Sequence, residues 1–217
     1  MFVRKGVIVV AENAVASCIG DVLRPFLREH EKVFLCSFQP GDRNLTDQSA
    51  RAVEMLGGQV IQCSEDRRWY SLLRQVFTNR AAVLIGLPGL VLGLAKVARV
   101  TGTPLPVRHV VLLGKVSKPW LLKGIRDSLD AEIHICNLPA EAFLRKNHTD
   151  FLLEQLDEQL LSWSSILDYR ASRTQQGLCL EILTFPGRQL PHLPSGARVT
   201  VRSWNPRTDI PFCLRDG

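Results

Sequence analysis

Residues 81–114, AAVLIGLPGLVLGLAKVARVTGTPLPVRHVVLLG, decide the fold. The stretch opens with a short apolar run at 81–85, which predicts a buried strand. A Gly-Leu-Pro-Gly turn at 86–89 ends that strand, and the apolar spacing of residues 90–100 predicts a helix. A second apolar run follows at 107–113. Two such strands joined by one helix are typical of a parallel βαβ unit, because parallel neighbours need a crossover connection.

The same alternation extends outward from this unit in both directions. Further strands are expected at residues 7–11, 33–38, 59–63 and 132–136. Further helices are expected at residues 15–29, after Thr46, at 69–77 and at 119–129. The strand segments are continuously apolar, which indicates burial on both faces of the sheet. We therefore expect an α/β fold with a mostly parallel sheet of about six strands and helices on both faces.

The character of the sequence changes after Pro139. One or two helices are expected at residues 140–162, and the chain then becomes rich in strand signals. Three strands are expected at residues 166–170, 178–185 and 197–204. They predict a small antiparallel β-rich C-terminal segment. We divide the chain into an α/β domain at residues 1–164 and a β-rich subdomain at residues 165–217.

Composition and charge exclude several classes of protein. The chain has 217 residues, 46% of them hydrophobic and 22% charged, which excludes a disordered tail, a fibrous repeat and a disulfide-dense secreted module. The net charge is +6, but the basic residues are scattered, so no nucleic-acid partner is expected. No apolar stretch approaches the roughly 20 residues that span a bilayer, so no membrane partner is expected. We expect a cytoplasmic protein, because the apolar run near the N-terminus is short and is soon followed by Glu12, unlike a signal peptide.

The sequence contains no established catalytic or nucleotide-binding motif. G-x-G-x-x-G, Walker A, G-x-S-x-G and H-E-x-x-H patterns are all absent. The six cysteines form no C-x-x-C pair, which favours small buried hydrophobic roles, and no metal site is predicted. The five histidines are isolated in the sequence, and His109 and His134 fall in predicted strands, where we expect hydrogen-bonded structural roles. The residues of any catalytic step are therefore unknown from these patterns.

Candidate binding residues follow the predicted strands, because ligands of open parallel sheets bind outside the carboxyl ends of the strands. Gly86 and Pro88 follow one strand, Gly114 and Lys115 the next, and Asn137 the last. Glycine would let the backbone approach a ligand, and the free N–H groups of the following helix would suit an anion. Lys115 would add positive charge to the same rim. The alternative is that the glycines serve only turn geometry and that Lys115 is a solvent-exposed side chain.

Three segments between Ala52 and Glu141 resemble the adenylate-forming acyl-CoA ligases, especially their phenylacetate–CoA ligase branch: AVEMLGGQVIQCS, WYSLLRQVFTNRAAVLIGLPGLVLGLAKVA and PVRHVVLLGKVSKPWLLKGIRDSLDAEIHICNLPAE. In that family a strand, a small residue, a proline and a helix follow one another, as at residues 83–89 here. The resemblance implies that Gly114 borders an adenine pocket and that Glu141 keeps the acidic group that helps to hold magnesium. It also implies ATP or AMP, or CoA, as the ligand, and ATP-dependent acid–CoA ligation as the activity.

The departures from the family pattern weaken the case for catalysis by this chain alone. The Gly/Ser/Thr-rich phosphate loop with its lysine has no counterpart, and Lys115 stands where the family has an acidic or small residue. The aromatic-Gly-x-Thr-Glu motif is reduced to Cys-Asn-Leu-Pro-Ala-Glu at 136–141, and no C-terminal lid with a catalytic lysine is recognisable. Each missing donor is typically worth about 2.7–4 kcal/mol of transition-state stabilisation. We therefore expect a degenerate or partial AMP-binding protein, shorter than a full ligase, that acts as a ligand-binding or accessory subunit. A second subunit would supply the missing motifs.

Other hypotheses come from different classes of protein. The chain is alternatively an active aryl- or acyl-CoA ligase whose motifs have diverged, or a non-catalytic protein-interaction domain. An interaction surface would use the aromatic residues of the C-terminal segment, Trp163, Phe185, Trp204 and Phe212. We favour the simpler expectation that these residues seal the C-terminal segment against the α/β layer. A nucleotide-dependent oxidoreductase is a fourth hypothesis, weakened by the missing glycine fingerprint.

Overall fold

The computed structural model describes residues 14–36, 43–63, 66–114, 119–138, 160, 165–175, 177–188, 190 and 197–211. The strands of the larger sheet are β1 (Lys32–Leu35), β2 (Gln59–Gln62), β3 (Val83–Gly86), β4 (His109–Leu113) and β5 (Glu132–Cys136). The helices are α1 (Ala14–Leu23), α2 (Arg43–Met55), α3 (Trp69–Asn79), α4 (Pro88–Thr101) and α5 (Pro119–Arg126). The strands of a smaller sheet are β6 (Ile166–Thr174), β7 (Gly177–Thr184) and β8 (Arg198–Ser203).

The larger sheet is parallel throughout the described strands, which lie in the order β2-β1-β3-β4-β5. This confirms the α/β fold and the mostly parallel sheet that the sequence predicts. Each step along the chain from one of these strands to the next carries a helix, as α4 does between β3 and β4. The remaining predicted strand, at residues 7–11, lies outside the described residues.

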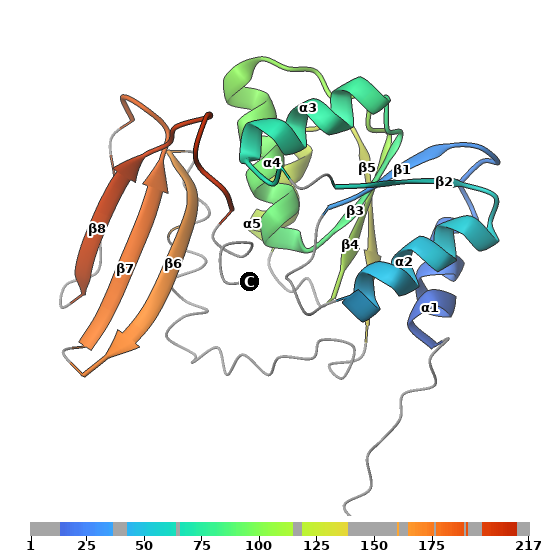
Figure 1. Cartoon of the computed structure of the whole chain (residues 1–217), viewed down its shortest axis with the longest axis horizontal. Coiled ribbons are helices and arrows are strands. Elements are labelled where there is room, and N and C mark those ends of the chain that lie inside the picture. The colour runs from blue at the N-terminus through green and yellow to red at the C-terminus, as the bar shows by residue number, and fades with distance from the viewer. Residues whose placement is uncertain are drawn as a thin grey trace, which may run out of the picture.

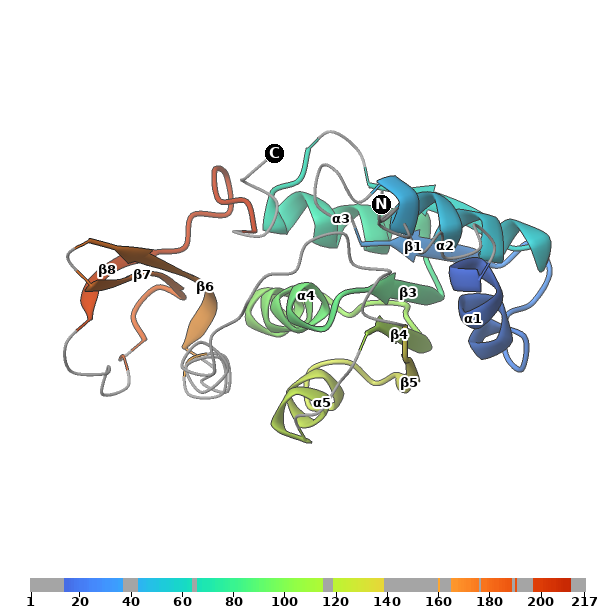
Figure 2. The same cartoon turned by 90° about the horizontal axis from the view of Figure 1, so that it is seen from below.

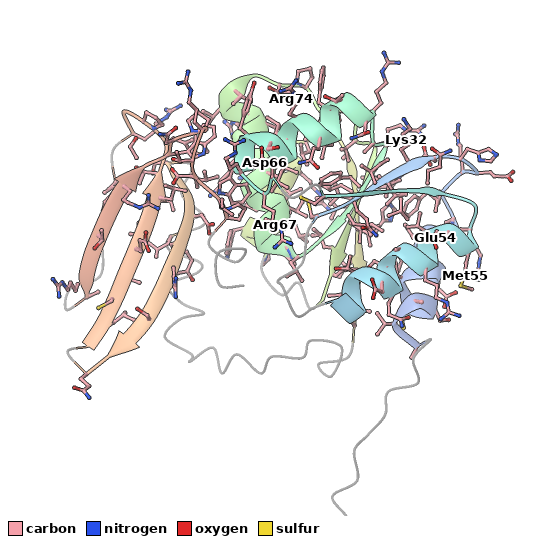
Figure 3. The ribbon with its side chains drawn as sticks, viewed as in Figure 1. Lys32, Glu54, Met55, Asp66, Arg67 and Arg74 are labelled. Carbon is pink, nitrogen blue, oxygen red and sulfur yellow. The ribbon has the colours of Figure 1, made fainter. Side chains whose placement is uncertain are left out.

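Helices cover both faces of the larger sheet (Figures 1 and 2). The helices α3, α4 and α5 lie on one face, and α1 and α2 lie on the other. Because successive strand residues point to opposite faces, Leu84 packs with α3 and α4, whereas Val83 and Ile85 pack with α1 and α2. All three side chains are fully buried, which explains why β3 is continuously apolar. Figure 3 shows the side chains that fill the space between the sheet and these helices.

The helix ends differ from the predicted ones for local reasons. A helix was expected at residues 15–29, but α1 ends at Leu23, since Pro25 lacks an N–H and disfavours helical backbone at the residue before it. The helix α4 begins at Pro88, where a missing N–H costs nothing because the first helical N–H has no partner within the helix. No helix among the described residues is long and apolar enough to cross a membrane. The helices predicted at 140–162 lie outside the described residues, apart from Leu160.

The C-terminal sheet is mixed, which corrects the prediction of a purely antiparallel segment. The strands β6 and β7 are antiparallel, but β7 and β8 are parallel, with Cys179 opposite Arg198 and Thr184 opposite Ser203. Residues 185–197 separate β7 from β8. A connection of this length permits a crossover, since parallel strands need about a dozen residues between them, whereas a hairpin needs only a few.

The C-terminal sheet packs on the face of the α/β layer formed by α3 and α4. Phe185 and Trp204 are buried in the same hydrophobic cluster as these helices, and their rings meet edge to face with centroids 5.6 Å apart. The backbone N–H of Trp69, at the start of α3, also donates to the carbonyl of Asp209 over 3.1 Å. The expectation that aromatic residues seal this segment is confirmed for Phe185 and Trp204. Trp163, Phe212 and the predicted boundary near residue 164 lie outside the described residues.

Candidate functional site

The strand order places a topological switch point between β1 and β3. From β1 the chain passes to β2 at one side of the sheet, and it then returns to β3 on the other side of β1. In doubly wound sheets with the order 2-1-3-4-5, ligands bind outside the carboxyl ends of the strands at this point. The candidate site is therefore the carboxyl edge of β1 and β3, with the neighbouring ends of β4 and β5 beside it.

Gly86 is the last residue of β3, and close packing requires it to be glycine. A Cβ atom at Gly86 would lie 2.7 Å from Cβ of Cys36, which follows β1, and 3.1 Å from Cγ2 of Val91. The carboxyl ends of β1 and β3 therefore meet without room for a side chain between them. For Gly86 this geometry supports the alternative of a packing role without excluding an adjacent ligand.

The N-terminus of α4 opens onto the same edge. Leu87 is its N-cap residue, with extended backbone (φ −71°, ψ 142°) and without a capping hydrogen bond from its side chain. Pro88 occupies the first helical position, and a Cβ atom at Gly89 would meet nothing within 4 Å. The first N–H groups of a helix have no intrahelical acceptor and carry partial positive charge, which suits an anion. The space beside Gly89 would allow such a group to approach.

Gly114 and Asn137 extend this edge along β4 and β5. Gly114 directly follows β4 and has φ +100°, a backbone conformation that residues other than glycine rarely adopt. Its N–H donates to the carbonyl of Cys136 over 2.9 Å, and exposed Asn137 follows Cys136. The structure thus brings Gly86, Pro88, Gly114 and Asn137 to the ends of three neighbouring strands. Lys115 and Glu141 lie outside the described residues.

The thiols near this edge are structural. Cys36 and Cys136 are buried thiols, which confirms their predicted role as small hydrophobic residues. Burial, with a smaller contribution from Cys18, raises the pKa of the Cys136 thiol to about 11. Because the thiolate is the nucleophile, Cys136 is not activated for covalent chemistry at neutral pH.

A basic hollow of about 590 Å³ lies between α4, α5 and the turn after β7. Its charged lining consists of four basic side chains and one carboxylate: Lys96, Arg99, Lys123, Arg188 and Asp127. Nζ of Lys96 donates to the carbonyl of Ile166 over 2.7 Å, and burial lowers the pKa of this lysine to about 8. Part of this hollow leaves a signal in the sequence, since Lys96 and Arg99 are three residues apart and lie on the same face of α4.

A second arrangement that sequence reasoning missed joins His109, Glu132 and His134. Nδ1 of His109 lies 3.2 Å from Nε2 of His134, which fits the hydrogen-bonded roles expected for both. The two histidines are too far apart in the sequence to form a recognised motif. Only the parallel register of β4 and β5 brings them together.

Comparison with known proteins supports the fold of this chain but assigns it no family, activity or substrate. No protein-family model matches the sequence, and no curated protein matches it. A solved structure of 2-hydroxyisobutyryl-CoA ligase in the postadenylation state, in complex with R3-HIB-AMP, has a TM-score of 0.60 and 12% identity, and covers 95% of this chain and 69% of that chain. The same ligase in complex with 2-HIB-AMP and CoA, in the thioesterification state, has a TM-score of 0.50 and 17% identity over 60% of this chain.

The chain spans only part of these enzymes. It covers 29% of the ligase in the thioesterification state and 32% of the chain in an open conformation, where the TM-score is 0.49 and the identity 16%. The match with a TM-score of 0.60 shows that the chain has a fold that resembles adenylate-forming CoA ligases, as the sequence resemblance predicts.

Proposed function

We propose that this chain is a degenerate or partial relative of the adenylate-forming acyl-CoA ligases, of the phenylacetate–CoA ligase-like branch, that binds an adenine nucleotide or an acyl adenylate. It acts as a ligand-binding or accessory subunit. The observation that carries the proposal is the likeness to 2-hydroxyisobutyryl-CoA ligase in complex with R3-HIB-AMP, which includes 95% of this chain.

The carboxyl edge supplies groups that suit such a ligand. The N-terminus of α4 presents backbone N–H groups beside the open space at Gly89, where a phosphate would be favoured. Gly114, by its resemblance to the glycine of the ligases, would border the adenine ring. The exposed amide of Asn137 offers both a donor and an acceptor to a base or a ribose.

We infer an accessory role because the sequence lacks groups that adenylation requires. Charge-matched donors and a metal ion around the transferring phosphates supply most of the acceleration in phosphoryl chemistry. The sequence lacks a counterpart of the phosphate loop with its lysine, and it carries Lys115 in place of an acidic or small residue. We therefore propose that a second subunit completes the site. The cytoplasmic location expected from the sequence stays a prediction.

Calorimetric titration tests whether the chain binds an adenine nucleotide or an acyl adenylate. We expect saturable heat on titration of the full chain with AMP, with ATP, or with a non-hydrolysable phenylacetyl-adenylate analogue. CoA is titrated into the protein saturated with the adenylate analogue. If none of these compounds binds, the proposal is refuted.

A pyrophosphate-release assay separates the accessory role from active ligation. With phenylacetate or another aryl acid, ATP and Mg²⁺, we expect no release above the protein-free rate. Steady release that Glu141→Ala abolishes would instead support an active ligase with diverged motifs.

A further inference from the structure

Three side chains of types that commonly bind metal ions converge at the amino ends of β4 and β5, on the sheet face that carries α1. His109 is the first residue of β4, and Glu132 is the first residue of β5 and pairs with it in register. His134 lies two residues further along β5, so it points to the same face as Glu132. One nitrogen or oxygen from each of the three residues lies within 4.8 Å of the other two.

The two distances from Nδ1 of His109 match the edges of a tetrahedral metal site. Nδ1 of His109 lies 3.2 Å from Nε2 of His134 and 3.6 Å from Oε2 of Glu132. Zinc–ligand bonds of about 2.0–2.2 Å in tetrahedral geometry place neighbouring ligand atoms about 3.3–3.6 Å apart. We propose that His109, Glu132 and His134 bind a divalent transition-metal ion, and that this ion is Zn²⁺.

The surroundings keep the two imidazoles oriented and available. The ring of Phe26 stacks on His109 with centroids 4.3 Å apart and on His134 with centroids 4.1 Å apart. Burial lowers the pKa of both histidines, with Glu132 acting in the opposite sense. The two nitrogen donors favour Zn²⁺ over Mg²⁺ or Ca²⁺, which prefer oxygen.

Solvent reaches the three residues from the side of Glu132. The side chain of Glu132 is 68% exposed, whereas that of His109 is 19% exposed. Three protein ligands and a water molecule in the fourth position are a common zinc arrangement. The ion would join β4 to β5 across the sheet. The site lies at the opposite ends of the strands from the proposed nucleotide site, so it goes beyond that function and does not depend on it.

Calorimetric titration of the chelator-treated full chain with ZnCl₂ tests the proposal. We expect one bound ion per chain and a rise in the melting temperature. Glu132→Gln should weaken binding at least tenfold, since loss of even an outer-shell partner costs about 10–100-fold. His134→Gln should abolish it. Glu132→Gln remains decisive if His134→Gln fails to fold by circular dichroism, because Glu132 is exposed.

Two control variants and a spectroscopic probe exclude other zinc ligands. His30→Asn removes an exposed histidine at a left-handed position (φ 62°) that asparagine tolerates, and Cys18→Ser removes an exposed thiol. Both should leave zinc affinity unchanged. Co²⁺ should give the intense visible absorption of a tetrahedral site without a thiolate charge-transfer band. Failure to bind stoichiometric zinc, or equal affinity in Glu132→Gln and the unmodified chain, would overturn the proposal in favour of a direct imidazole–imidazole hydrogen bond.

Discussion

Replacement of Gly93 by alanine should destabilise the chain, because α3 packs directly on this position of α4. A Cβ atom at Gly93 would lie 2.1 Å from Cη2, 2.6 Å from Cζ3 and 2.9 Å from Cζ2 of Trp69. Ordinary contact begins near 3.4 Å, so the ring would have to retreat by about 1.3 Å. Trp69 is only 1% exposed, and its backbone N–H donates to the carbonyl of Asp209, which holds the start of α3 in place. Because the indole is surrounded by the buried side chains of the core, it has little room to retreat.

The expected net loss is about 2–3 kcal/mol of unfolding free energy. Overpacking of this kind costs about 3 kcal/mol or somewhat more, and the higher helix propensity of alanine returns about 1 kcal/mol. Gly89→Ala is the matched control, because it lies in the same helix and its Cβ would meet nothing within 4 Å. That variant should be as stable as the unmodified chain or up to about 1 kcal/mol more stable.

Urea unfolding followed by circular dichroism measures both variants. A double-mutant cycle with Trp69→Phe, which removes the clashing part of the ring, should give a coupling energy above about 1 kcal/mol. Equal stability of the Gly93→Ala and Gly89→Ala variants would refute the packing argument.

Three further perturbations follow from the described contacts. Burial lowers the pKa of Lys96 from the ordinary lysine value of 10.5 to about 8, so between pH 8 and pH 10.5 this side chain is protonated mainly in the unfolded state. The stability of the unmodified chain relative to Lys96→Met should therefore rise by about 3 kcal/mol from pH 8 to pH 10.5, measured by urea unfolding; a flat difference contradicts the burial. The Arg68 side chain lowers the pKa of Asp66, labelled in Figure 3, to about 2. Asp66→Asn should lower the free energy of unfolding by less than about 1 kcal/mol at pH 7, because the Asp66–Arg68 ion pair is partly exposed. This difference should disappear as the pH falls from 3.8 through 2, and a difference that persists below pH 2 would exclude the ion pair as its origin. Gly114→Ala should lower the melting temperature, since its φ of +100° costs about 1–3 kcal/mol for other residues, and an unchanged melting temperature would contradict this.

The parallel sheet could be predicted from the sequence because its signal is local. The central strand at residues 83–86 is continuously apolar and buried on both faces, and a helix follows it, as a parallel neighbour requires. The direction of β8 could not be predicted in this way. It depends on the course of residues 185–197 between the two strands, and the same apolar pattern serves a strand of either direction.

The sequence predicts which residues follow the carboxyl ends of the strands, but not the role of each one. From the sequence, Gly86 could border a ligand or form part of a turn. Only the short distance between a Cβ atom placed at Gly86 and Cβ of Cys36 shows that packing requires glycine there. The convergence of His109 with His134 was missed, because it depends on which strands become neighbours and on their register. Contacts between residues far apart in the sequence leave no periodicity in the sequence itself.

AMP binding by Gly89 variants tests the central claim most directly. Aspartate at this position would suit the helix, since acidic residues are favoured in the first turn, but its charge would repel a phosphate at the same N–H groups. Two unit charges about 4 Å apart interact by about 4 kcal/mol at an effective dielectric constant near 20. In calorimetric titrations we predict one-site AMP binding to the unmodified chain, affinity within about threefold for Gly89→Asn, and at least a tenfold loss for Gly89→Asp. The absence of AMP binding by the unmodified chain, or equal affinity in the two variants, would contradict a nucleotide site at the N-terminus of α4.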